Sequence, residues 1–244
     1  MLKALRLSEI SAPLHARLIG EDCAFDAVST DSRAIQPGQL FIALTGPNFD
    51  GHAYLADVAA KGAVAALVER EVAGVALPQL LVADTRLALG RLGALNRQAY
   101  GGPLVAVTGS SGKTTVKEML ASILRTAFVE QGNSVLATRG NLNNELGVPL
   151  TLLELASQHK AAVIELGASR VGEIAYTVSL AQPHVAIITN AGTAHVGEFG
   201  GPEKIVEAKG EILAGLGAGG VAVLNRDDPA VMAKLDAVAG RLFG

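Results

Sequence analysis

The sequence predicts an α/β protein of two units, the second of which is built on a mostly parallel sheet. Half of its 244 residues are hydrophobic, enough to fill the cores of one large or two modest domains. Beyond residue 100, short β-branched runs alternate with longer segments of helical spacing, a pattern typical of parallel strands connected by helices. The breaker cluster from Gly101 to Pro103 precedes this alternation and predicts the boundary between the units.

Residues 1–83 mix short strands with small helices, which predicts a compact α/β domain. The pattern indicates a helix after Ser8, a helix near residues 52–61, and strands near residues 25–28, 40–44 and 63–68. Residues 84–102 have helical spacing followed by the breaker cluster, so a connecting helix and linker are expected there.

Residues 103–244 carry the alternating pattern and predict the second domain. Its strands are expected at residues 103–109, 161–167, 184–192 and 219–225. Apolar runs of this kind are buried on both faces of a sheet that helices cover. Ligands of such a sheet are expected where strands end and helices begin.

Composition disfavours several classes of function. The formal net charge of -3, with scattered lysines and arginines, gives no basic surface that would gather nucleic acid. Cys23 is the single cysteine, so no intrachain disulfide forms, as expected for a cytoplasmic protein. Charges at Lys3, Arg6 and Glu9 interrupt any signal-peptide pattern, and the absence of a membrane-length apolar run predicts no membrane insertion.

The stretch VAVTGSSGKTTVKEM places a glycine loop between a predicted strand and an amphipathic helix. This order predicts a phosphate-binding loop, because the loop amides and the helix N-terminus point at an anion. Lys113 is expected to neutralise the outer phosphates, and Thr114 to offer its hydroxyl to magnesium. Val107 stands where the common phosphate-loop pattern has a glycine, and an ordinary glycine-rich turn is the alternative interpretation.

Three further residues are candidates, two after predicted strands and one on a predicted helix. Glu165 ends a buried strand, where an unpaired carboxylate is costly, so either a metal or a surface position explains it. His195 follows the strand at 184–192, and both a ligand and a solvated histidine fit that position. Lys209 lies on a predicted helix among three glutamates, a pattern that by itself favours a solvated helix face with ion pairs.

Five segments together resemble the ATP-dependent muramyl ligases of peptidoglycan synthesis: TGSSGKTT, TRGNLNNELGVPLTLL, IELGASRVGEIA, TNAGTAHVGEFG and AKGEI. Because these ligases open their glycine signature with Thr-Gly, here Thr108 and Gly109, the resemblance accounts for Val107. Upstream, STDSRAIQPGQLFIALTGPNFDGHAYLADVAAKGA resembles the UDP-binding domain of the same family. One departure is Ser169-Arg170, where many relatives have Asn-His.

The resemblance implies a ligase that activates a carboxylate with ATP as an acyl phosphate and then joins it to an amine. The pair Asn143-Asn144 favours the branch whose small-molecule substrates are UDP-N-acetylmuramoyl-tripeptide and D-alanyl-D-alanine, and both side chains are expected at the tripeptide. A ligase for another amino acid and a module that binds UDP-sugar or nucleotide without turnover are the alternatives. Since the family has three domains, we expect a chain truncated within its ATPase domain, lacking the third domain, inactive alone and monomeric.

The same resemblance assigns site residues. ATP is expected on Gly109, Ser110, Ser111, Gly112, Lys113, Thr114 and Thr115. Lys113, Glu165, His195 and Lys209 are expected to act in catalysis. Thr114 and Glu165 would hold magnesium between two phosphates, while His195 and Lys209, the latter as a carbamate formed with carbon dioxide, would serve a second metal. The UDP moiety is expected on Ser29, Asp31, Ser32, Arg33, Thr45, Gly46, Asp50, Gly51 and His52.

Overall fold

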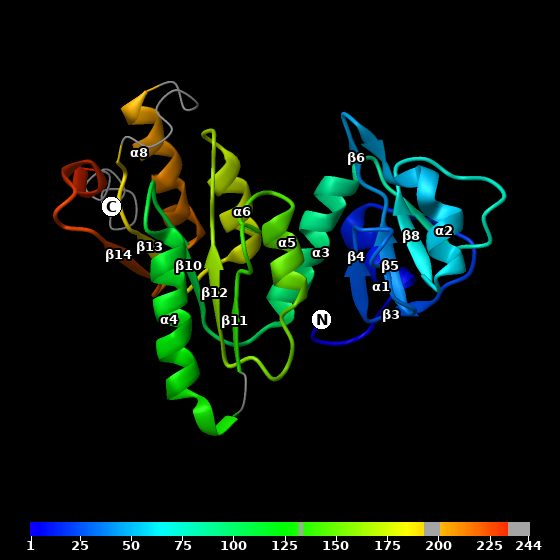
Figure 1. Ribbon diagram of the computed structural model, residues 1–244, viewed down its shortest axis with the longest axis horizontal. Coiled ribbons are helices and arrows are strands. Elements are labelled where there is room, and N and C mark those ends of the chain that lie inside the picture. Colours follow the sequence, from blue (N-terminus) through cyan, green and yellow to red (C-terminus); the bar gives the residue numbers. More distant parts are fainter. Residues whose placement is uncertain (132–133, 193–200, 234–244) are drawn as a thin grey trace. The chain divides into compact units, whose positions relative to one another are not determined.

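The computed structural model describes residues 1–131, 134–192 and 201–233 (Figure 1). The chain forms two compact units that meet between Asn96 and Arg97, inside the segment 84–102 that was predicted to connect the domains. Helix α3 (Thr85–Ala99) carries the chain from one unit to the next. Within the described residues, no helix combines the length and the apolar character needed to cross a membrane.

The first unit contains a five-stranded sheet in the order β2-β9-β8-β5-β4. The strands are β2 (Arg17–Ile19), β9 (Gln79–Leu81), β8 (Ala65–Val68), β5 (Gln39–Ile42) and β4 (Ala27–Ser29). The pair β2-β9 is antiparallel and the other pairs are parallel. Two short antiparallel ladders accompany the sheet: β1 (Leu5–Arg6) with β3 (Ala24–Phe25), and β6 (Thr45–Gly46) with β7 (Phe49–Asp50).

Apolar spacing explains the helices of this unit. Helix α1 (Leu7–Leu14) buries Leu7, Ile10 and Leu14. Ile10 and Leu14 follow Leu7 by three and seven residues, so the three side chains lie on one face of the helix. The predicted helix at 52–61 begins as a 3₁₀ turn, Gly51–Tyr54, and continues as α2 (Leu55–Ala60). Leu55 and Val58 of α2 pack in one core cluster with Phe41 of β5. Full burial of each such side chain stabilises the fold by about 1.5–3 kcal/mol.

The second unit contains a parallel sheet in the order β11-β12-β10-β13-β14. The strands are β10 (Leu104–Thr108), β11 (Val135–Ala137), β12 (Ala161–Glu165), β13 (Val185–Ile188) and β14 (Val221–Leu224). Four of them lie in the predicted runs, whereas β11 was not predicted. The helices are α4 (Lys113–Ala127), α5 (Gly147–Leu153), α6 (Glu173–Ala181) and α8 (Pro202–Gly210), and a 3₁₀ helix, η3 (Glu211–Gly215), follows α8.

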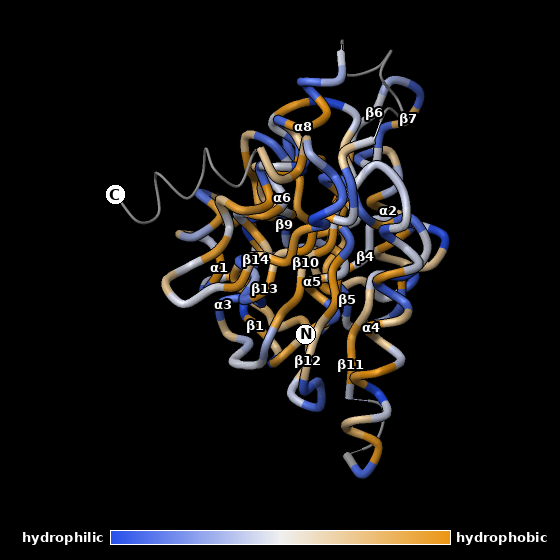
Figure 2. The backbone as a smooth tube through the Cα atoms, turned by 90° about the vertical axis from the view of Figure 1, so that its left-hand side faces the viewer, coloured by the Kyte–Doolittle hydropathy of each residue, from blue (hydrophilic) through white to orange (hydrophobic). Residues whose placement is uncertain are grey.

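Helices cover both faces of this sheet, as expected for continuous apolar strands. Figure 1 shows α4 on one side of the strands and α5 and α6 on the other. All five residues of β12 are buried, and the hydropathy colouring of Figure 2 marks β10, β11 and β12 as hydrophobic. In the sheet register Val107 pairs with Glu165, and Thr108 pairs with Ile188. The carboxyl ends of the three central strands therefore meet at one edge, where the site is found.

Candidate functional site

The glycine loop between β10 and α4 requires glycine at two positions. Gly109 has φ +149° and Gly112, which precedes the first residue of α4, has φ +77°. A Cβ atom on Gly109 would lie 2.0 Å from Thr189 Oγ1. At Gly109 only glycine fits such a backbone so close to the neighbouring strand end, whereas at Gly112 the positive φ alone favours glycine.

The end of strand β13 holds this loop in place. The Ser110 amide donates to the Asn190 carbonyl (3.0 Å), and the Ser111 amide donates to Asn190 Oδ1 (3.1 Å). The Thr189 hydroxyl donates to the Ser111 carbonyl (2.6 Å). Neither Thr189 nor Asn190 was predicted as a site residue; their place directly after a predicted strand was the available signal.

The first residues of α4 direct their side chains to two different partners. Lys113 Nζ donates to the Gly109 carbonyl (2.8 Å), so its ammonium lies across the loop. The Thr114 hydroxyl donates to Glu165 Oε2 (3.0 Å). Thr115 is exposed on the same turn. Thr114 therefore connects the start of α4 to the carboxyl end of β12, while Lys113 bonds to the loop itself.

Glu165 is buried at the end of β12, with 2% of its surface exposed. The surface position that the sequence left open is therefore wrong. Its carboxylate accepts hydrogen bonds from Thr114 and from Asn143 Nδ2 (2.9 Å), and Lys117 Nζ lies 3.9 Å from Oε2. A buried charge needs such partners, because desolvation otherwise costs several kcal/mol.

The two asparagines predicted at the tripeptide make different contacts. Asn143 turns toward Glu165, and a Cβ atom on Gly167 would lie 2.9 Å from its side chain. Asn144 Oδ1 accepts from the amides of Leu146 and of Gly147, the first residue of α5. Both side chains line the same cavity. Their contact with a tripeptide stays a prediction.

Lys209 is buried, with 3% of its surface exposed. The solvated helix face that the pattern alone favoured is therefore wrong. Burial, and next the positive charge of Lys113, lower the pKa of Lys209 to about 8, against the smaller raising effect of Glu173 and Glu211. Lys209 Nζ lies 3.5 Å from the Ala168 carbonyl, at the long limit for a hydrogen bond.

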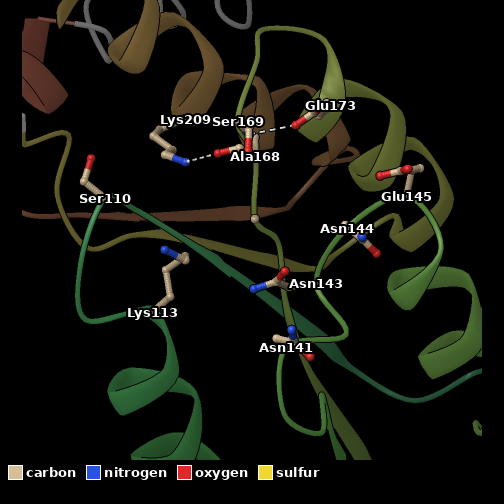
Figure 3. A pocket seen from close by; sticks show the side chains of 11 residues that line it. Ser110, Lys113, Asn141, Asn143, Asn144, Glu145, Ala168, Ser169, Glu173 and Lys209 are labelled. Atoms are coloured by element: carbon tan, nitrogen blue, oxygen red, sulfur yellow. Dashed lines mark hydrogen bonds between the residues drawn. The ribbon is translucent and has the colours of Figure 1, made fainter. Parts of the chain in front are cut away.

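Lys113, Asn143, Asn144 and Lys209 line one cavity of about 380 Å³, whereas Thr114 and Glu165 are not among its lining residues (Figure 3). Its lining consists of Ser110, Lys113, Asn141, Asn143, Asn144, Glu145, Gly167, Ala168, Ser169, Glu173 and Lys209. Figure 3 shows Lys113 on α4 and Lys209 on α8, with the asparagines on the loop before α5. In the described part of the chain, no group of three His, Cys, Asp or Glu side chains could hold a metal by itself. His195 lies outside the described residues.

The first unit has a cavity of about 420 Å³. It is lined by Thr30, Asp31, Ser32, Arg33, Phe41, Leu44, Phe49, Gly51 and Tyr54. Arg33 donates to both carboxylate oxygens of Asp31 (2.9 and 2.8 Å) and lowers the pKa of Asp31 to about 2. Phe49 and Tyr54, which were not predicted, expose 51% and 46% of their surface.

Five other residues predicted to bind UDP do not line this cavity and contact neighbours within the same unit. His52 is buried between two partners: Nδ1 donates to Asp50 Oδ1 (2.7 Å), and Nε2 accepts from the Glu69 amide (2.9 Å). Asp50 also binds Arg70. Thr45 and Gly46 form the β6–β7 hairpin, and the Ser29 hydroxyl closes a turn with Asp31. Direct contact of these residues with a ligand stays a prediction.

This arrangement defines a phosphate-loop α/β domain: a strand, a glycine loop and a helix follow one another, and a buried carboxylate ends the adjacent strand. The model of the Mur ligase middle domain matches residues 107–241, and that of the Mur ligase family catalytic domain matches residues 24–97. The chain therefore belongs to the Mur ligase family.

Two curated relatives of the same name are similar to this chain over most of its length. The UDP-N-acetylmuramoyl-tripeptide--D-alanyl-D-alanine ligase of Escherichia coli K12 is 51% identical over 176 residues, which is 72% of this chain and 38% of that protein. The enzyme of the same name from Haemophilus influenzae is 48% identical over 177 residues, with the same two coverages. The chain thus spans about two fifths of the length of these curated relatives.

Two solved structures of MurF enzymes are similar in fold to this chain. A crystal structure of MurF from Acinetobacter baumannii superposes with a TM-score of 0.89 at 44% identity, covering 98% of this chain and 52% of that one. The MurF ligase of Thermotoga maritima in complex with ADP gives a TM-score of 0.78 at 34% identity, covering 86% and 48%.

Proposed function

We propose that this chain carries the UDP-substrate site and the ATP-phosphate site of a ligase that adds D-alanyl-D-alanine to UDP-N-acetylmuramoyl-tripeptide. One observation carries the proposal: the phosphate loop is bonded through Thr114 to the buried carboxylate of Glu165, beside a cavity that Lys113 and Lys209 line. The names of the curated relatives and the ADP in the Thermotoga maritima structure support it. The single free cysteine agrees with the cytoplasm as its compartment, and we propose a monomer.

The chemistry follows from the poor reactivity of a carboxylate toward amines. The tripeptide carboxylate attacks the γ-phosphorus of ATP and releases ADP; the amine of D-alanyl-D-alanine then attacks the acyl carbon and releases phosphate, with loss of one proton. Both partners of the first step are anions. Lys113 offsets their charge, and the loop fixes their orientation.

Magnesium fits the donors that line this region. Mg²⁺ prefers oxygen ligands and is often held by one or two carboxylates together with substrate phosphates, rather than by a cage of protein groups. Glu165 and the Thr114 hydroxyl, 3.0 Å apart, are such donors. When bound, the metal would supply positive charge against the phosphates. His195 remains the proposed donor at a second metal.

Lys209 is the proposed site of a carbamate. Its amine must be neutral to attack carbon dioxide, and a pKa of about 8 leaves a larger neutral fraction than an ordinary lysine has. The ammonium first loses one proton; the neutral nitrogen then forms a bond to the carbon of carbon dioxide and loses a second proton, which leaves a carbamate anion in place of a cation. A lysine could then serve as an oxygen ligand.

The cavity of the first unit suits a uridine diphosphate. Phe49 and Tyr54 offer flat apolar surfaces for a base, and Arg33 offers a planar guanidinium for the diphosphate. Because Arg33 already pairs with Asp31, the diphosphate would share or replace that partner.

The test is calorimetric titration of the chain with UDP-N-acetylmuramoyl-tripeptide. We expect binding that Arg33→Ala weakens and that Arg6→Ala leaves unchanged. Arg6 is the matched control, since it is also an exposed arginine paired with an aspartate, Asp22, but lies outside the cavity lining. A folded chain that fails to bind this ligand, or equal losses in the two variants, would overturn the assignment.

A further inference from the structure

Lys117 is a buried cation that the proposed chemistry does not use. It lies on α4, three residues after Thr114, and only 1% of its surface is exposed. Its ammonium donates to the Thr138 carbonyl (2.7 Å) and lies 3.1 Å from Glu118 Oε1. It also lies 3.9 Å from Glu165 Oε2, the oxygen that accepts from Thr114.

Packing alone does not explain a lysine at this position. An apolar residue of similar size would fill the same space without the cost of desolvating an ammonium. The surroundings are built around the charge instead: Thr138 accepts from Lys117 through its carbonyl, and its hydroxyl accepts from the Glu165 amide (2.9 Å). Thr138 therefore connects Lys117 to the backbone of Glu165, in addition to the approach of the ammonium to the carboxylate.

We infer that Lys117 is a positioning residue that pairs with the Glu165 carboxylate when no nucleotide is bound. This pairing disfavours the binding of a divalent metal at Glu165 in the absence of nucleotide phosphates. This inference rests on the proposed function, in which Glu165 holds magnesium. A bare metal at Glu165 would share one carboxylate with the ammonium, and the two positive charges repel each other. Metal that enters together with nucleotide brings negative charge, which offsets this repulsion.

The experiment titrates the full chain with Mn²⁺, without nucleotide, and reads the free metal by electron paramagnetic resonance. Lys117→Gln removes the charge but keeps a donor for the Thr138 carbonyl. We expect it to bind Mn²⁺ about tenfold more tightly than the parent chain, because a nearby like charge is lost. Lys117→Arg keeps the charge and should stay near the parent affinity.

Glu118→Gln is the matched control, because Glu118 contacts Lys117 and is exposed. It should leave Mn²⁺ binding near the parent value. Glu165→Gln should weaken Mn²⁺ binding in the Lys117→Gln background. If it does not, the metal is not at Glu165, and the proposed function fails at this site.

If Glu165→Gln has its effect but Lys117→Gln binds Mn²⁺ no better than the parent, only the inference about Lys117 is overturned. Circular dichroism checks that each variant folds, and Lys117→Met provides a second neutral side chain. Failure of both neutral variants to fold, while Lys117→Arg folds, would show a purely structural role and would also overturn the inference.

Discussion

Gly109→Ala should destabilise the second unit because the phosphate loop has no room for a methyl group. The new Cβ would lie 2.0 Å from Thr189 Oγ1, and the Asn190 backbone nitrogen and oxygen lie 3.2 and 3.1 Å away. Thr189 cannot turn aside freely, since its hydroxyl donates to the Ser111 carbonyl. The loop or the end of β13 must therefore move.

The cost follows from two contributions. A non-glycine residue at φ +149° is strained by about 1–3 kcal/mol. Displacing the neighbouring strand end, or breaking the hydrogen bond of Thr189, adds about 1–3 kcal/mol. We expect the free energy of unfolding to fall by about 2–6 kcal/mol in total.

Two glycines provide matched controls. Gly112 has φ +77° with nothing within 4 Å of a new Cβ, so Gly112→Ala should cost only the backbone strain of about 1–2 kcal/mol. Gly101 has open space and no positive φ, so Gly101→Ala should change stability by less than about 0.5 kcal/mol. Urea unfolding followed by circular dichroism measures all three variants.

A double variant separates the two contributions to the cost at Gly109. Thr189→Ala removes the clashing oxygen, so Gly109→Ala should cost less in that background than in the parent chain. The reasoning is refuted if Gly109→Ala is no more costly than Gly101→Ala, or if Thr189→Ala leaves its cost unchanged.

Three further predictions concern charged side chains. Lys113→Ala should weaken the binding of magnesium-ADP about ten- to hundredfold, because a charged hydrogen bond contributes about 1.5–3 kcal/mol. Calorimetry measures this affinity. The control Lys204→Ala removes an exposed lysine paired with a glutamate and should have little effect. Carbon-13 NMR with labelled bicarbonate should detect a carbamate that increases as pH rises through about 8, the pKa of Lys209, and a signal that persists in Lys209→Arg would contradict the assignment. Asp31 should titrate near pH 2, since its pKa is lowered to about 2 mainly by Arg33. NMR titration of the Arg33→Ala variant should show the pKa of Asp31 nearer the ordinary value of an aspartate. The ion pair with Arg33 thus favours folding above that ordinary pKa, and its contribution is lost as pH falls through about 2.

Sequence pattern predicted the central strands well because their burial leaves a strong signal. Strands β10, β12 and β13 are short β-branched runs in the middle of the sheet. Strand β11 was missed, because three residues at a sheet edge give too short a run to distinguish from a loop. The same holds for β2, the edge strand of the first unit.

Several candidate site residues were predictable because they lie at the end of a strand or in the glycine loop, although Thr189 and Asn190 at the end of β13 were missed. Lys113, Thr114 and Glu165 all meet at the carboxyl edge of the sheet, as the fold requires. Lys117 was not predicted, because helical spacing shows which residues share a face but not which face a sheet covers. Only the packing of α4 on the sheet places this lysine inside.

Two carboxylates act on buried Lys209: Glu211, one of the three glutamates in its sequence pattern, and Glu173 of α6, which the pattern did not include. Glu211 accepts from the amides of Gly172 and Ala175, and Glu173 accepts from the Ser169 amide, so these carboxylates bind the backbone at the start of α6. They raise the pKa of Lys209 less than burial and Lys113 lower it. The glutamates thus fix the wall of the cavity rather than neutralise the lysine. The cavity lining thus combines two lysines, Lys113 and Lys209, with two carboxylates, Glu145 and Glu173, and Lys113 is the cation that the proposed function assigns to phosphate.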